Sequence, residues 1–308
     1  MANGSAQQLD PDLFLLDLHF QSTPGVVGAY LITGSDGHTL LETGPGSTLP
    51  SLERAVHASG ARFEEITQLV VTHIHLDHAG AAGTLLRRLP DARLFVHPLG
   101  AKHMIDPAKL LASATRIYGG RMDRLWGAFE ACPPDRVVTL EDGDEIACGA
   151  RTLTALHTPG HAVHHIAFHD ADAGSIFTGD VGGVRIPGTL QVRPPTPPPD
   201  IDVEYWHASI DRLRALEPRT LDLTHFGRFH DPGRHFDDLL YRLDDWTTWV
   251  DDRLRDGFSR SEMATALRLR SDAEIAEDGD VAATAAAFEL ATPADMTVDG
   301  LVRYLNGR

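Results

Sequence analysis

Four side chains that can bind a metal ion occur close together in the segment THIHLDHAG, residues 72–80. They are His73, His75, Asp77 and His78. Neutral imidazole and carboxylate are ligands that Zn(II), Fe(II) and Mn(II) accept. Because one tetrahedral ion does not readily take four ligands from so short a segment, the spacing favours two neighbouring ions whose shells other segments complete. A purely structural role would crowd these titratable groups together without benefit.

Three later segments place a further histidine or aspartate after a predicted strand and beside a glycine. They are HTPGH at 157–161, FTGD at 177–180 and THFG at 224–227. Glycine lets the backbone turn sharply, so each segment can direct a side chain towards one edge of a sheet. The ligand candidates among them are His161, Asp180 and His225. Taken singly, Asp180 resembles an ordinary turn residue, and neither His157 nor the later His230 is expected to be a ligand.

The candidates need strands and helices to position them. Apolar, β-branched runs predict strands at 13–19, 26–33, 38–42, 68–72, 92–98, 135–140, 151–157, 163–168, 174–179 and 220–224. Positions 73 and 75 would share one face of an extended segment, and a turn before Gly80 would direct Asp77 and His78 back to the same place. Helices are expected at 49–58, 80–88 and 203–216, and over most of the chain after 232.

Two segments interrupt this pattern. Residues 99–131 have helical patterns without a β signal, which indicates a helical insertion. The loop VRPPTPPPD at 192–200 has five prolines in nine residues, which exclude a helix or a central strand. At 308 residues the chain is long for one domain and short for two. We expect a catalytic domain at 10–231 and a helical C-terminal extension, 232–308, packed on it.

The composition limits the classes of partner. Lys and Arg number 27 and Asp and Glu number 44, which gives a formal charge of −17. Such a surface repels phosphate backbones, and no basic stripe offsets it, so a nucleic acid is not expected as partner. No apolar run approaches the ~20 residues of a membrane span, and no signal peptide is visible. Cys132 and Cys148 form no disulfide framework or C-x-x-C pair, so we expect a cytoplasmic protein acting on a small molecule.

The metal-ligand segments resemble those of a known family. THIHLDHAG is similar to the H-x-H-x-D-H signature of the metallo-β-lactamase superfamily, and HTPGH, FTGD and LTHFG resemble its further ligand segments in the same order. The resemblance spans about residues 26–228. It implies an α+β fold, a four-layer αββα sandwich with the helical insertion and the helical C-terminal region added. A dinuclear metal site would lie at one edge of the sandwich.

The resemblance also implies a role for each ligand. The first metal would be held by His73, His75 and His161. The second would be held by Asp77, His78 and His225. Asp180 would bridge the two. We expect two Zn(II) ions, with Fe and Mn as alternatives.

Three further residues are candidates for supporting the ligands. The family usually has Asp where this chain has Glu42 in LLETGPG, so Glu42 is expected to support the site with a longer reach. His164 and His165 are expected in a strand, where they would face opposite sides, so at most one can point at the site. The histidine that points at the site would hydrogen-bond a metal ligand. The alternative for each of the two is an ordinary polar residue of the strand.

The implied chemistry is hydrolysis. A metal-bridging hydroxide would attack an acyl carbon, and Asp77 would orient it and carry a proton to the leaving group. We expect an ester or thioester substrate, since the motifs are closest to the glyoxalase II-like branch. The C-terminal region has no basic cluster of the kind glyoxalase II uses for glutathione. Two alternatives stay open: a lactonase of the acyl-homoserine-lactone type, and a mononuclear iron enzyme resembling the persulfide dioxygenases.

The insertion and the proline-rich loop are expected to flank an apolar substrate cleft. Tyr118, Met122 and Trp126 are the pocket candidates on the insertion. The alternative is that these side chains pack the insertion onto the core, as the apolar faces of amphipathic helices do. The sequence leaves open whether the protein is a monomer or a homodimer.

Overall fold

The computed structural model describes residues 4–275 and 281–307 of the chain. The chain folds into two compact units. The first comprises Met1–His157 and His164–Ser175, and the second comprises Thr158–Val163 and Ile176–Arg308. The division into 10–231 and 232–308 that the sequence suggests stays a prediction.

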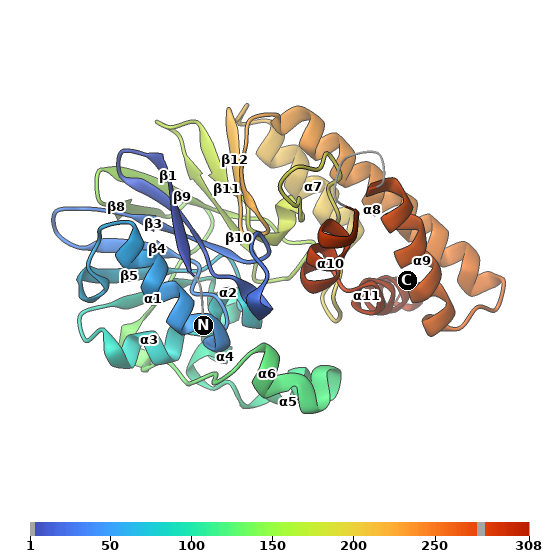
Figure 1. Cartoon of the computed structure of the whole chain (residues 1–308), viewed down its shortest axis with the longest axis horizontal. Coiled ribbons are helices and arrows are strands. Elements are labelled where there is room, and N and C mark those ends of the chain that lie inside the picture. The colour runs from blue at the N-terminus through green and yellow to red at the C-terminus, as the bar shows by residue number, and fades with distance from the viewer. Residues whose placement is uncertain (1–3, 276–280, 308) are drawn as a thin grey trace. The chain divides into compact units, whose positions relative to one another are not determined.

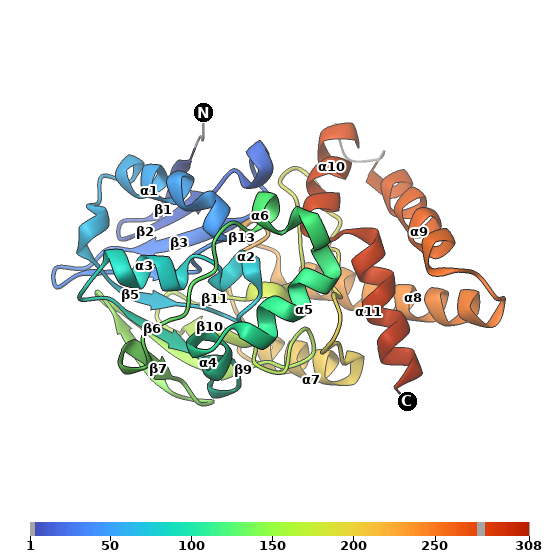
Figure 2. The same ribbon diagram turned by 90° about the horizontal axis from the view of Figure 1, so that it is seen from below.

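A seven-stranded mixed sheet dominates the first unit (Figure 1). Its strands follow sequence order: β1 (Ser5–Asp10), β2 (Leu13–Asp17), β3 (Gly28–Ile32), β4 (His38–Leu41), β5 (Ile66–Val70), β6 (Arg93–Val96) and β7 (Val137–Thr139). Strands β1 to β4 pair antiparallel, and β4 to β7 pair parallel. Helix α1 (Leu49–Ala58) packs on β1 and β2, and α3 (Ala82–Arg88) packs on β6 (Figure 2). The parallel strands contribute buried apolar side chains such as Leu41, Leu69 and Leu94 to this sheet.

The second sheet has the strand order β13-β12-β11-β10-β9-β8. Its strands are β8 (Glu145–Cys148), β9 (Arg151–His157), β10 (Ile166–Asp170), β11 (Ser175–Phe177), β12 (Thr220–Leu223) and β13 (Gly227–Phe229). Within the first unit, Arg151 at the start of β9 joins this sheet to the first one. Its guanidinium donates to Asp12 Oδ2 at 2.9 Å and Asp170 Oδ2 at 2.9 Å, and it also reaches Asp10.

The insertion between β6 and β7 is helical. It consists of α4 (Pro98–Ile105), α5 (Ala108–Tyr118) and the short α6 (Met122–Leu125). Its end is attached to the loop after β4, because the Ser47 backbone N–H donates to the Trp126 carbonyl at 3.0 Å and the Ser47 hydroxyl donates to the Leu125 carbonyl at 2.6 Å.

Five helices make up most of the second unit. They are α7 (Val203–Arg214), α8 (Pro232–Arg255), α9 (Arg260–Ile275), α10 (Val281–Ala291) and α11 (Ala294–Asn306). The longest, α8, buries the apolar positions Phe236, Leu239, Leu243, Trp246 and Val250. Their spacing of three or four residues forms one stripe, against which α7 and α11 pack. None of the helices in the described ranges is long and apolar enough to cross a membrane.

The structure differs from the predicted elements at four places. The strands β1, β8 and β13 were not predicted, because SAQQLD is largely polar and EIAC and GRF are only four and three residues long. The expected strand at 163–168 begins only at Ile166. His164 and His165 therefore lie in the turn before β10, and the argument that they face opposite sides of a strand is wrong.

Candidate metal centre

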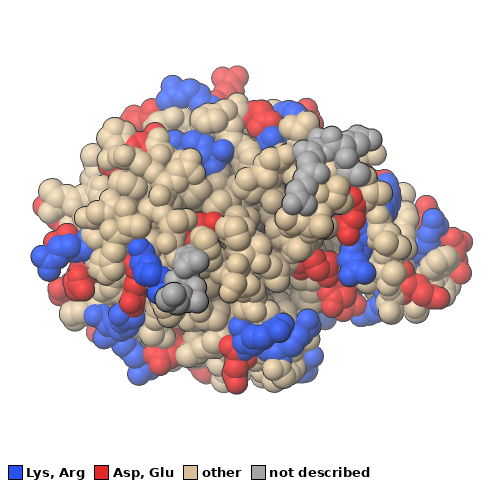
Figure 3. Space-filling view, viewed as in Figure 1, with Lys and Arg blue, Asp and Glu red and all other residues tan. Residues whose placement is uncertain are grey.

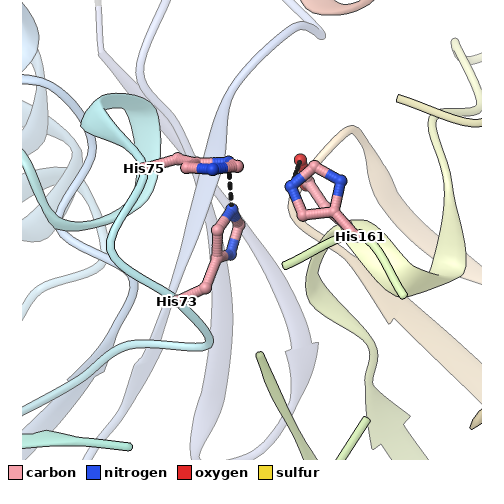
Figure 4. A group of neighbouring side chains, drawn as sticks. His73, His75 and His161 are labelled. Carbon is pink, nitrogen blue, oxygen red and sulfur yellow. Dashed lines mark hydrogen bonds and ion pairs between the residues drawn. The ribbon is translucent and has the colours of Figure 1, made fainter. Parts of the chain in front are cut away.

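The segment with four candidate ligands lies where β5 leaves its sheet. His73 and His75 lie in the connection to the one-turn helix α2 (Leu76–Ala79), and Asp77 and His78 lie on that helix. His73 Nε2 is 2.9 Å from His75 Nδ1 (Figure 4). The His73 and His78 ring centroids are 3.9 Å apart. The short helix thus returns the chain so that all four side chains meet, and only His75 and Asp77 are partly exposed.

Glu42 supports this segment from the end of β4. Its side chain is fully buried, and its Oε1 accepts from the Thr72 hydroxyl at 2.6 Å and lies 3.1 Å from His78 Nδ1. A carboxylate on Nδ1 fixes the tautomer of an imidazole and turns Nε2 towards a metal. The Glu42 backbone is left-handed, with φ 67°, a conformation that costs a non-glycine residue ~1–3 kcal/mol and that concentrates at functional sites.

Thr72 is a supporting residue that the sequence argument missed. Its hydroxyl donates to Glu42, and the same oxygen lies 3.0 Å from His73 Nδ1. One threonine thereby links the buried carboxylate to the first histidine. Its place directly before the ligand segment was the only available signal.

Asp180, His161 and His225 form a group of their own in the second unit. Asp180 Oδ2 lies 3.3 Å from His161 Nε2, and Asp180 Oδ1 lies 3.4 Å from His225 Nε2. Each carboxylate oxygen therefore faces a different imidazole, which is the arrangement a bridging carboxylate needs. All three side chains are buried.

A backbone carbonyl sets the orientation of His161. Its Nδ1 is 2.8 Å from the Pro195 carbonyl oxygen. A carbonyl only accepts, so Nδ1 carries the proton and Nε2 is left as the metal-binding nitrogen. Pro195 belongs to the proline-rich loop, and since its contribution is a main-chain atom, no residue type in the sequence pointed to it.

Two groups of donor atoms in the described residues can each hold a metal ion. One comprises His73, His75, His161 and Asp180, and the other comprises Asp77, His78 and His225. Within each group the donor atoms all lie within 4.8 Å of one another. Figure 4 draws the three histidines of the first group. Imidazoles with carboxylates fit Zn(II), Fe(II) or Mn(II). The number and identity of the ions stay predictions.

The remaining histidines divide into two sets. The rings of His164 and His165 lie 6.2 and 5.1 Å from that of His73, so both adjoin the ligands. His157 instead stacks on His97, with ring centroids 4.4 Å apart, and burial together with His157 lowers the pKa of His97 to about 4. His157 and the exposed His230 belong to neither donor group.

The three pocket candidates lie around a buried aromatic cluster. Trp126 stacks on Phe20 with ring centroids 5.6 Å apart and meets Tyr118 edge-on at 5.0 Å. Trp126 is only 8% exposed, whereas Tyr118 and Met122 are half-buried. Trp126 therefore packs the insertion onto the loop after β2. A role of these residues in binding substrate stays a prediction.

The family model of the metallo-beta-lactamase superfamily matches residues 22–225. The chain belongs to this superfamily. Among solved structures, a metallo-beta-lactamase family protein from Thermus thermophilus has a TM-score of 0.68 at 21% identity and covers 97% of this chain and 95% of its own. These findings confirm the predicted family and the α+β sandwich with a helical C-terminal region.

Curated relatives of the superfamily match at low identity. A metallo-beta-lactamase fold-containing protein of Sulfurisphaera tokodaii is 26% identical over 66% of this chain and 74% of its own length. The acyl-coenzyme A thioesterase MBLAC2 of Homo sapiens is 26% identical over 57% of this chain and 65% of its own length. A hydroxyacylglutathione hydrolase of Synechococcus sp. is 27% identical over 62% of this chain and 60% of its own length. The matches thus span less than two thirds of the last two relatives.

Proposed function

We propose that the chain is a metal-dependent hydrolase that cleaves an ester or thioester of a small, partly apolar substrate. The observation that carries the proposal is Asp180, whose two oxygens face His161 and His225, members of the two donor groups. Relatives named as an acyl-coenzyme A thioesterase and a hydroxyacylglutathione hydrolase support a thioester. The formal charge of −17 disfavours a nucleic acid.

The protein residues have three tasks in this proposal. When bound, two divalent ions, for which we propose Zn(II), would supply a water of lowered pKa and a Lewis acid for the acyl oxygen. The two donor groups would hold these ions, and Glu42 and the Pro195 carbonyl orient His78 and His161. Asp77 is partly exposed on the first turn of α2, so its carboxylate can take a proton and pass it to the leaving thiol or alcohol.

Metal analysis and a substrate panel test the proposal together. Protein purified without chelator should approach two metals per chain, and it should hydrolyse thioesters or esters. Stripping the metal should abolish the activity, and adding it back should restore it. Asp77→Asn should lower kcat by orders of magnitude and also weaken binding of the metal that Asp77, His78 and His225 would hold.

Each alternative gives a different result in the same experiment. Hydrolysis of acyl-homoserine lactones alone would identify a lactonase. One iron per chain, which added metal cannot raise, together with oxygen uptake on a persulfide, would identify a dioxygenase. Fully metal-loaded protein that is inactive on every ester and thioester would refute the proposal.

A further inference from the structure

The helical insertion has the opposite charge to the rest of the protein. Residues 98–125, which form α4 to α6, contain five basic and two acidic side chains, so their formal charge is +3 in a chain of −17. Both lysines of the chain are among the five. The five are all exposed: Lys102, Lys109, Arg116, Arg121 and Arg124. We refer to them as the basic face. In Figure 3, basic side chains gather at the lower edge of the view, where α5 and α6 lie in Figure 1.

The basic face is not neutralised by acidic side chains. Some exposed arginines elsewhere in the described chain pair with carboxylates, as Arg62 does with Glu65 at 3.6 Å and Arg260 with Asp299 at 2.9 Å, whereas others, such as Arg93, do not. None of the five side chains of the basic face makes an ion pair with a described residue. Like charges left close together repel one another, and a bound anion relieves that repulsion.

Both ends of the insertion adjoin the segments that hold the metal ligands in the first unit. At the start of α4, a Cβ on Gly100 would lie 2.8 Å from the Ile74 side chain, and Ile74 separates His73 from His75. At the other end, Trp126 and Leu125 accept hydrogen bonds from Ser47, in the loop that follows Glu42. The helices that carry the basic face are therefore attached at both ends to segments that adjoin the ligands of the first unit.

We propose that the basic face binds the phosphates of the thiol carrier of the substrate, so that the substrate class is an acyl thioester of a phosphate-bearing thiol such as coenzyme A. This rests on the proposed thioester hydrolysis and narrows it. The guanidinium groups of Arg116, Arg121 and Arg124 can each donate two parallel hydrogen bonds to a phosphate. A thiol carrier without phosphate forms none of these hydrogen bonds. The basic face would therefore make the protein prefer substrates whose thiol carrier bears phosphates.

The test compares one acyl group on two thiols. Metal-loaded protein is assayed with octanoyl-coenzyme A and with octanoyl-N-acetylcysteamine, which has the same thioester and no phosphate. The variant R116Q/R121Q/R124Q should lower the preference in kcat/KM for the coenzyme A thioester about tenfold, since each exposed ion pair contributes a factor of about two to three. The loss should appear in KM. Raising the ionic strength to ~1 M should have the same effect on the wild type, because the screening length falls to ~3 Å.

A matched control removes the same charge elsewhere. R62Q/R255Q/R260Q replaces three exposed arginines that pair with Glu65, Asp251 and Asp299, and it should keep the preference of the wild type. Binding of free coenzyme A to metal-free protein, measured by calorimetry, gives a readout apart from activity. Its Kd should rise about tenfold in the first triple variant and not in the control.

The outcomes separate this inference from the proposed function. If metal-loaded protein hydrolyses neither thioester, the proposed function fails. If it hydrolyses both with equal kcat/KM, and R116Q/R121Q/R124Q changes neither the preference nor the Kd, the proposed function stands and the basic face is only a solvated surface. An equal loss in the control variant would show a general effect of net charge and would also overturn the inference.

Discussion

Glu42→Gln should weaken metal binding without unfolding the protein. Glu42 is fully buried, and its Oε1 serves two neighbours at once, the Thr72 hydroxyl and His78 Nδ1. Glutamine has nearly the same shape and can still accept from Thr72. It has no negative charge, so it holds the His78 ring less firmly in the tautomer that presents Nε2.

The size of the effect follows from the one interaction that changes. A hydrogen bond to a charged group contributes about 1.5–3 kcal/mol, roughly twice a neutral one. Losing the charge while keeping the contact therefore costs ~1–2 kcal/mol, and loss of such an orienting partner lowers metal affinity about 10–100-fold in other proteins. We expect a loss of at least tenfold at the site that includes His78, with less effect on the other.

The assay is competition with a chromophoric chelator, which gives each stepwise affinity. Glu42→Asp is the matched variant, because it keeps the charge and shortens the reach by one methylene, and its affinity should lie between those of wild type and Glu42→Gln. The Tm of the metal-free proteins shows whether either substitution damages the fold. If Glu42→Gln binds both metals within about twofold of wild type at an unchanged metal-free Tm, the orienting role is refuted.

Three further substitutions test other contacts. Asp180→Asn should lower the affinity for at least one metal, and elemental analysis that still finds two tightly held ions would contradict the bridging role. Gly300→Ala should lower the Tm and weaken metal binding, because the new Cβ would lie 1.8 Å from the Thr196 carbonyl oxygen, next to Pro195. Arg151→Met should lower the free energy of unfolding in urea by ~3 kcal/mol, because the buried carboxylate of Asp170 loses its cation. Arg151 lowers the pKa of Asp12 below 3.8, so its stabilisation is present above that pH and is lost as the pH falls further; the variant should differ less from wild type in acid.

The ligand segment could be predicted because its information is local. His73, His75, Asp77 and His78 are close in sequence, and the short α2 keeps them close in space. The parallel strand β5 was also predictable, since it ends in the buried apolar residues Leu69 and Val70. The polar strand β1 and the four-residue strand β8 could not be predicted, because their pairing with a neighbour, and not their own composition, makes them strands.

The residues that support the ligands were harder to predict from the sequence. Glu42 was singled out because it stands where the family usually has aspartate, but its left-handed backbone and its contact with His78 depend on how the ends of β4 and β5 meet. Thr72 carries no motif of its own. The basic face was hidden for a similar reason: its five cations are spread over more than twenty residues of an acidic chain, and the helices of the insertion gather them.

The C-terminal helices affect the candidate metal centre through a main-chain carbonyl group. His161 is oriented by the Pro195 carbonyl, and the loop that carries Pro195 is held by helices that follow the residues matched by the family model, 22–225. The Thr196 hydroxyl donates to the Thr297 carbonyl of α11 at 3.2 Å, and Arg193 lies 4.0 Å above the Phe288 ring of α10. The ligand histidine is therefore positioned by a part of the chain that contains no ligand. Sequence motifs are defined by side-chain types. They therefore cannot show that a backbone carbonyl is held in place by residues about a hundred positions further along the chain.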